Sequence, residues 1–132
     1  MSDLIIFHTS VLVDQLRTDC HRRRIETLNG LIRNASVVLA ELWRGVVTPA
    51  DRVALARNHP TITPAQNNWL ESGKILGEIR ADCGLTADKL RDLHFDVLIA
   101  LTARSNDARL ITSNRADFKM IDSYRKLQLE IW

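Results

Sequence analysis

The sequence predicts an α/β fold, with a parallel sheet covered by helices on both faces. Short apolar runs such as Leu4 to Phe7 and Arg109 to Thr112 alternate along the chain with longer segments of helical spacing. A continuous apolar run is typical of a strand that is buried on both faces, as in a parallel sheet. Strands that alternate with helical segments indicate parallel pairing through helical crossovers.

The bulk composition is typical of one ordinary globular domain, which we expect to span residues 1–132. The chain has 45% hydrophobic residues, and its net charge of +2 comes from 18 basic and 16 acidic residues. A balance this small neither requires nor excludes a nucleic-acid partner. No apolar run approaches the ~18 residues of a membrane span, and no signal peptide is recognisable at the N-terminus. We therefore expect a cytoplasmic protein without a membrane partner.

The N-terminal third predicts two strands. The first is Leu4 to Phe7, and Thr9 or Ser10 could cap the helix that follows it. Apolar residues at helical spacing between 25 and 32 predict a second helix. The short β-branched run at 36–39 predicts the second strand, which leads into a helical turn.

The middle of the chain is mostly helical by pattern. Thr48 and Pro49 are typical of a helix start, with the threonine as cap and the proline in the first helical position. Residues 61–62 predict a minimal edge strand. In the next helix, Trp69 begins an apolar stripe that we expect to pack on the sheet. Residues 85–93 are polar and mixed, which indicates a loop with a helical turn.

The C-terminal third carries the most informative stretch. Asp96 opens a run with helical spacing over 97–103, and a buried strand follows at 109–112. Residues 113–117 are polar and turn-like. Apolar and polar residues alternate over 127–131, which predicts a final edge strand.

Three acids are expected where strands end or helices begin: Glu41, Asp96 and Asp117. In open parallel sheets these positions can converge at the carboxyl edge. Carboxylates that are packed together repel one another, and a hard divalent cation with oxygen ligands commonly relieves the repulsion. The alternative is that the acids are helix caps and solvated loop residues.

Four stretches of the chain resemble a known family. The chain is similar to PIN-domain ribonucleases of the kind found as the VapC toxins of bacterial toxin–antitoxin pairs. The matching stretches occur in the family's order and together span nearly the whole chain: 5–14, 38–45, 96–103 and 110–118. The resemblance implies a three-layer α/β/α sandwich around a central parallel sheet. It also implies hydrolysis of RNA phosphodiester bonds with Mg²⁺ or Mn²⁺ as cofactor.

The resemblance assigns roles to individual residues. Glu41, Asp96 and Asp117 match the family's metal ligands, and Asn114 matches a catalytic position close to the metal. Small hydroxyl residues that orient the site are matched at two further positions, Ser10 and Thr112. The acids are implied to hold the metal while an activated water attacks phosphorus.

The first metal position departs from the family, because His8 stands where an aspartate is expected directly after the first strand. An imidazole replaces an anionic oxygen with a nitrogen, which Mg²⁺ tolerates poorly and Mn²⁺ or Zn²⁺ accepts. Three explanations remain open. His8 is an inactivating change in a toxin, a natural substitution in a degenerate homologue, or a working ligand for a softer metal. Asp14 lies ~9 Å further along a helix and does not replace the missing acid.

Basic residues near the matched stretches are candidates for RNA contacts. Arg44 and Arg115 lie beside motif residues, where they could contact phosphates. The basic run 21–24 suits either an RNA backbone or an ordinary solvated helix end. His94 lies two residues before Asp96, so it is either a neighbour of the site or a loop residue.

The resemblance also implies partners, namely an RNA substrate, a small antitoxin protein and a second copy of the chain in a homodimer. A catalytically inactive PIN-fold module that binds RNA or protein is the alternative that His8 raises. A signalling domain with an acidic phospho-acceptor pocket is a weaker alternative. It would need paired acids after the first strand and a late lysine, where this chain has Ser113 and Asn114.

Overall fold

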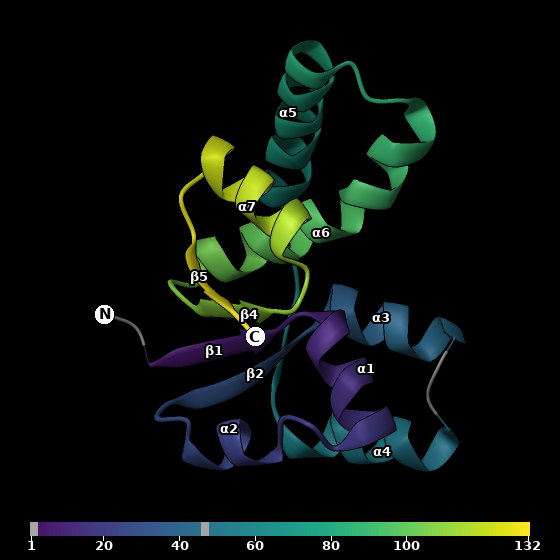
Figure 1. Ribbon diagram of the computed structural model, residues 1–132, viewed down its shortest axis with the longest axis vertical. Helices are drawn as coiled ribbons and strands as arrows, with labels where there is room; N and C mark the ends of the chain where they lie inside the picture. The colour runs from purple at the N-terminus through teal and green to yellow at the C-terminus, as the bar shows by residue number, and fades with distance from the viewer. Residues whose placement is uncertain (1–2, 46–47) are drawn as a thin grey trace.

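The protein is seen in a computed structural model, which describes residues 3–45 and 48–132. At its centre is a five-stranded sheet with strand order β3-β2-β1-β4-β5 (Figure 1). All four neighbouring pairs are parallel. The strands are β1 (Leu4–Phe7), β2 (Leu31–Ala35), β3 (Thr61–Ile62), β4 (Arg109–Thr112) and β5 (Gln128–Ile131). The parallel sheet is confirmed, and the two strands expected at its edges, β3 and β5, lie there.

Helices cover both faces of the sheet, which gives the predicted three-layer α/β/α sandwich (Figure 1). The helices are α1 (Thr9–Thr18), α2 (Arg22–Thr27), α3 (Ser36–Gly45), α4 (Pro49–Asn58), α5 (Gln66–Cys83), α6 (Ala87–Ser105) and α7 (Arg115–Tyr124). None of the helices in the described ranges is long and apolar enough to cross a membrane.

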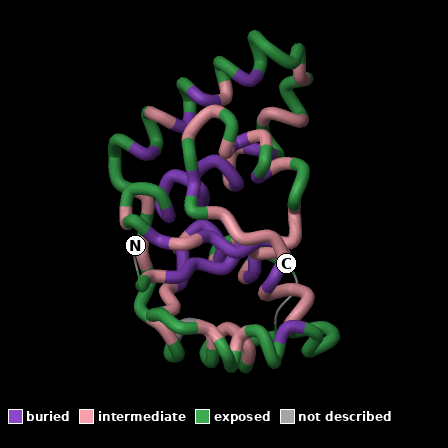
Figure 2. The backbone as a smooth tube through the Cα atoms, turned by 60° about the vertical axis from the view of Figure 1, so that its left-hand side comes forward, coloured by how far each residue is buried: buried purple, intermediate pink, exposed green. Residues whose placement is uncertain are grey.

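The side chains of β1 alternate between two core clusters, because successive side chains of a strand point to opposite faces of the sheet. Ile6 packs in the larger cluster with α3, α5, α6 and α7. Ile5 and Phe7 pack in the smaller cluster with Val11, and Ile25 of α2 lies against it. Figure 2 shows buried residues concentrated in the middle of the molecule, along the strands and the helices that flank them.

The second strand lies earlier than the sequence pattern predicted. Residues 31–35 form β2, so the helix expected over 25–32 is wrong and only the short α2 remains of it. The strand expected over 36–39 is also wrong, because these residues form the first turn of α3 and bury Val37 and Val38. A short β-branched run has the same apolar pattern in a buried strand and in a buried helical turn, so periodicity does not separate the two.

The helix that carries Asp96 begins earlier than predicted. The loop expected over 85–93 is wrong, because α6 begins at Ala87 and continues without a break. Thr86 caps it by accepting a hydrogen bond from the backbone N–H of Lys89 at 3.2 Å. A threonine cap with Asp88 in the first turn is a recognised start signal for a helix. The polar composition of this first half concealed the signal.

The stripe expected on α5 is confirmed in part, because α5 buries one face but Trp69 does not lie on it. The side chains that α5 buries are Asn68, Ser72, Ile75 and Ile79, and α5 packs chiefly on α6 rather than on the sheet. Trp69, which was expected in the core, is 49% exposed. The cap of α4 by Thr48 is confirmed, since its hydroxyl accepts from the N–H of Asp51 at 3.2 Å.

Candidate active site at the carboxyl edge of the sheet

His8 occupies the position directly after β1 and caps helix α1. The sequence had predicted Thr9 or Ser10 as the cap of this helix, and that prediction is wrong. The side chain of His8 is 7% exposed, and its Nε2 lies 2.9 Å from Oδ1 of Asp96. The extended backbone of a cap residue turns the imidazole across the end of the sheet, toward α6.

The other ring nitrogen of His8 is surrounded by hydroxyl groups. Nδ1 lies 2.9 Å from Oγ of Ser10 and 3.0 Å from Oγ1 of Thr112. The ring of Phe118 meets the imidazole edge-on, with 4.6 Å between the ring centroids. These contacts come from α1, β4 and α7, and together they hold the imidazole in one orientation.

The imidazole of His8 has two neutral forms, and only the form with the proton on Nε2 suits the 2.9 Å contact with Asp96 when no cation lies between them. With the proton on Nε2, the ring donates to Asp96 and Nδ1 accepts from a hydroxyl. With the proton on Nδ1, the ring donates to the hydroxyl oxygen of Ser10 or Thr112. In that second form the lone pair of Nε2 is directed toward the carboxylate and is available to a cation.

Asp96 lies in the middle of its helix rather than at its head, as the sequence had predicted. It is the tenth of the 19 residues of α6, and its side chain is 12% exposed. A helix dipole stabilises acids only within the first turn, so the dipole does not explain this carboxylate. Its neighbours along the helix, from Val97 to Ala103, are buried, so Asp96 is a polar group inserted into the core with His8 as partner.

Glu41 reaches the same place from α3. It does not directly follow a strand, as predicted, because it is the sixth residue of α3 and β2 ends at Ala35. The hydroxyl of Thr9 donates to its Oε1 at 2.7 Å. One potential ligand atom from each of His8, Glu41 and Asp96 lies within 4.8 Å of the others. The convergence expected for Glu41 and Asp96 is therefore present, with His8 as third member.

Asp117 is not a member of this cluster within the part of the chain that the structure describes, although the neighbouring Phe118 contacts His8. Asp117 lies in the first turn of α7, where its Oδ1 pairs with Nζ of Lys89 at 3.4 Å. Its Oδ2 accepts from Nδ2 of Asn114 at 3.1 Å, and its backbone N–H donates to Oδ1 of Asn114 at 3.3 Å. Asn114 is thus the cap of α7 as well as the partner of Asp117.

A chain of hydrogen bonds joins Asn114 to the cluster. The backbone N–H of Asn114 donates to Oγ1 of Thr112 at 3.0 Å, and the same hydroxyl contacts His8. The N–H of Ser113 donates to Oγ of Ser10 at 3.0 Å. Ser10 and Thr112, the predicted supporting residues, therefore link the two halves of the site. One half follows β1 and contains His8, and the other follows β4 and contains Asn114 and Asp117.

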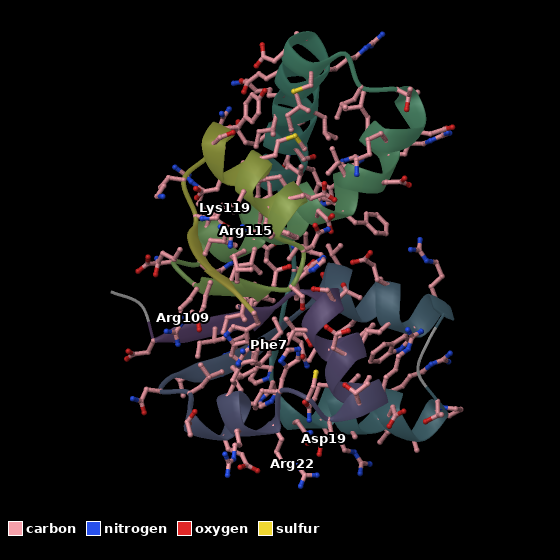
Figure 3. All side chains as sticks on the ribbon, viewed as in Figure 1. Phe7, Asp19, Arg22, Arg109, Arg115 and Lys119 are labelled. Carbon is pink, nitrogen blue, oxygen red and sulfur yellow. The ribbon has the colours of Figure 1, made fainter. Side chains whose placement is uncertain are left out.

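The two arginines considered for RNA contacts differ in their placement. The guanidinium of Arg44 lies over the ring of Phe95, 5.8 Å from its centroid. These residues and Glu41 border one pocket, described below. Arg115 is exposed at the start of α7, and Figure 3 shows it near Lys119.

The other basic candidates lie away from the cluster. Figure 3 shows Arg22 at the far end of the molecule from α7, beside Asp19, with which it forms an ion pair. His94 belongs to the interface between α5 and α6, where its Nε2 lies 3.1 Å from Oγ of Ser72.

Sequence reasoning missed three residues that shape the site. Thr9 was considered only as a helix cap, although its position beside His8 places it at the carboxyl edge of the sheet. Lys89 lies 28 residues from Asp117, and no local pattern connects the two. Phe118 directly follows Asp117 in the matched stretch, which was the available signal that it packs beside the site.

The donor set at the cluster fits a divalent cation that accepts nitrogen. Two adjacent ligands at about 2.1 Å from an octahedral ion lie about 3 Å apart. Nε2 of His8 and Oδ1 of Asp96 are 2.9 Å apart. A histidine that binds metal usually donates its other N–H to an oxygen, and Ser10 and Thr112 offer two such oxygens. One imidazole and two carboxylates suit Mn²⁺ better than Mg²⁺.

Comparison with solved structures gives clear relatives for the fold. A chain in the crystal structure of VapBC2 from Rickettsia felis, bound to a DNA fragment from their promoter, is 26% identical with a TM-score of 0.73, covering 98% of both chains. A chain of VapBC-1 from nontypeable Haemophilus influenzae is 20% identical with a TM-score of 0.74, again covering 98% of both chains. A chain of FitAB bound to an IR36 DNA fragment is 14% identical with a TM-score of 0.65, covering 96% of this chain and 94% of that one.

No family model and no curated protein sequence matches the chain. The likeness to the three solved structures nevertheless extends over almost the whole chain, and the resemblance read from the four sequence stretches covers the same length. The predicted resemblance to VapC-like PIN-domain proteins is therefore confirmed.

Proposed function

We propose that this protein is the toxin of a toxin–antitoxin pair and a metal-dependent endoribonuclease that hydrolyses RNA phosphodiester bonds. The observation that carries the proposal is the cluster of His8, Glu41 and Asp96, which converge from three elements at the carboxyl edge of the sheet. Parallel α/β sheets place their chemistry at this edge. The relatives come from VapBC and FitAB complexes, which supports the toxin assignment.

The residues of the cluster divide the work between them. Glu41, Asp96 and His8 would hold the cation. When bound, a divalent cation activates water and stabilises the charge that develops on phosphate. Thr9 orients the carboxylate of Glu41 through its hydroxyl. The hydroxyl oxygens of Ser10 and Thr112 would accept a hydrogen bond from Nδ1–H and so direct Nε2 of His8 toward the cation.

Asp117 and Asn114 would act at the half of the site that follows β4, at the start of α7. Their mutual hydrogen bonds fix both side chains at the start of α7. The ammonium group of Lys89 offsets the charge of Asp117, which lowers the repulsion between this carboxylate and an approaching phosphate. The side chain of Lys89 is 44% exposed, so it can move with the substrate.

His8 sets the metal preference of the proposed enzyme. An imidazole in place of an acid removes one negative charge and one oxygen ligand, which weakens Mg²⁺ binding more than Mn²⁺ binding. We therefore expect activity with Mn²⁺ and much less activity with Mg²⁺. The small antitoxin and the homodimer remain part of the proposal through the resemblance to VapC proteins.

RNA cleavage by this chain and by its His8→Asp variant, each with Mg²⁺, with Mn²⁺ and with EDTA, tests the proposal. We expect the chain to cut with Mn²⁺, the His8→Asp variant to cut with either ion, and EDTA to stop both. Asp96→Asn in the His8→Asp background is the control for a contaminating nuclease, and it should be inactive. Failure of His8→Asp to cut any RNA with either ion would contradict the proposal.

A catalytically inactive module that binds RNA or protein is the second candidate, and one observation favours it. Every acid of the site already has a donor from the protein: His8 for Asp96, Thr9 for Glu41, and Lys89 with Asn114 for Asp117. A site with this arrangement is stable without a cation. Binding of RNA without cleavage by either protein in the experiment above would support this candidate.

A further inference from the structure

A pocket of about 400 Å³ lies directly outside the proposed metal cluster, between α3 and α6. This volume is within the ~300–1,000 Å³ of ordinary small-molecule sites. Glu41 belongs both to the pocket and to the cluster. A group bound in the pocket would therefore be one side chain away from the reacting phosphate.

Two helix faces supply the walls of this pocket. Glu41 and Arg44 are three residues apart on α3, and Arg91 and Phe95 are four residues apart on α6. Side chains at these spacings lie on the same face of a helix. Phe95 is the direct neighbour of Asp96, and its half-buried side chain packs against the larger core cluster.

The chemistry of the pocket is that of a nucleotide subsite. The guanidinium of Arg44 lies over the ring of Phe95, and aromatic and guanidinium planes are the usual surfaces on which unpaired RNA bases stack. Arg44 forms no ion pair with an acid among the described residues, so its charge is available to a phosphate. Arg91 adds a second guanidinium, which is 76% exposed and, within the described ranges, forms an ion pair only with Asp88 of its own helix.

Asp92 adds a selective group to the same pocket. A carboxylate accepts hydrogen bonds from the exocyclic amino group of a base, as acidic side chains do from N4 of cytosine. The same carboxylate faces a carbonyl oxygen when uracil takes the place of cytosine. Two acceptors then oppose each other, so cytosine is favoured over uracil.

From these observations we propose that the pocket bordered by Glu41, Arg44, Arg91, Asp92 and Phe95 is a subsite for one unpaired nucleotide of an RNA. Its base stacks on Phe95 in place of the Arg44 guanidinium, and its phosphate contacts the guanidinium groups of Arg44 and Arg91. Asp92 favours a base that carries an exocyclic amino group. The inference rests on the proposed RNA substrate, and it names the residues that hold the nucleotide next to the cut.

Binding of labelled oligocytidine and oligouridine of equal length, measured by fluorescence anisotropy in EDTA, tests the subsite without any cleavage. Oligocytidine should bind more tightly than oligouridine. Phe95→Leu keeps an apolar side chain but removes the aromatic face, and Arg44→Gln removes the charge. Each should weaken binding about tenfold, the size expected for loss of one stacked base. Asp92→Asn should remove the preference for cytosine.

Lys126→Gln is the matched control, because Lys126 is 85% exposed after α7 and pairs with Asp122. It should leave binding unchanged. The subsite is overturned if the chain binds neither oligomer, or if the Phe95, Arg44 and Asp92 variants bind like the unchanged chain.

The outcome separates this inference from the proposed function. Cleavage by His8→Asp together with unaltered binding by the pocket variants would leave the nuclease standing and remove the subsite. Weakened binding by those variants without any cleavage by His8→Asp would leave the subsite standing and remove the hydrolysis.

Discussion

Nε2 of His8 lies 2.9 Å from Oδ1 of Asp96, across a gap of 88 residues in the sequence. Both side chains are almost fully buried, at 7% and 12% exposure. A carboxylate this deep needs a partner, because a buried unpaired charge is strongly destabilising. The imidazole is that partner in this protein, and the consequences for stability and metal binding follow from the contact.

Thr112 is the residue whose hydroxyl connects the two halves of the site, so its removal should lower stability. Thr112→Val keeps the shape but leaves the N–H of Asn114 and one contact of His8 without a partner. We expect the free energy of unfolding to fall by about 1–3 kcal/mol, measured by urea denaturation. Thr61→Val on the exposed edge strand is the control, and it should change the free energy of unfolding by less than about 0.5 kcal/mol. Equal unfolding midpoints for Thr112→Val and the unchanged protein would contradict the role given to this hydroxyl.

Lys89 offsets the charge of Asp117, so its removal should strengthen cation binding. Lys89→Gln makes the site more negative by one charge and releases Oδ1 of Asp117. The pair is partly exposed, and such pairs contribute about 0.2–1 kcal/mol, which corresponds to a rise in Mn²⁺ affinity of about five-fold at most. Titration calorimetry measures this affinity. Lys119→Gln serves as the control, because residues two apart on a helix do not share a face. A weaker Mn²⁺ affinity in Lys89→Gln would show that Lys89 does not act in this way.

Arg125 ties α7 to α5 through Glu71, and this contact gives stability a component that depends on pH. The hydrogen bond from Nε of Arg125 to Oε1 of Glu71, at 2.5 Å, holds the pKa of Glu71 below its ordinary value of 4.5. A lowered pKa in the folded state stabilises the protein above the unfolded pKa, and this stabilisation is lost as the pH falls through the folded pKa.

Glu71→Gln should therefore melt below the unchanged protein at pH 7, and the difference between the two melting temperatures should shrink below about pH 4.5. Thermal unfolding followed by circular dichroism between pH 7 and pH 3 measures the difference. A constant difference across this range would show that the ion pair adds no pH-dependent stability.

The sequence predicted most of the sheet because its central strands are continuous apolar runs. The strands at 4–7 and 109–112 lie where predicted, and so do both edge strands. The strand at 31–35 was missed because Arg33 and Asn34 interrupt its apolar pattern. Asn34 is nevertheless buried, since its amide donates to the carbonyl oxygen of Leu55 at 2.8 Å, a contact that no local pattern reveals.

In the candidate site too, local sequence patterns predicted which residues take part, but not the contacts that depend on how the helices pack. The resemblance to VapC proteins pointed to Glu41 and Asp96, although both lie inside helices rather than at the predicted strand end and helix head. The pairing of Asp117 with Lys89 could not be predicted, because it depends on how α6 and α7 pack. The sequence does place His8 directly after the first strand, and the structure adds its contacts with Asp96, Ser10 and Thr112.

The metal site formed by His8, Glu41 and Asp96 is best tested by calorimetric titration of Mn²⁺ and Mg²⁺ into the protein, its His8→Asp variant and its Asp96→Asn variant. We expect the unchanged protein to bind Mn²⁺ more tightly than Mg²⁺, and His8→Asp to raise Mg²⁺ affinity about tenfold or more because it restores an anionic oxygen ligand. Asp96→Asn should abolish tight binding of both ions. An Mn²⁺ affinity that is the same in all three proteins would contradict the assignment of His8, Glu41 and Asp96 as a metal site.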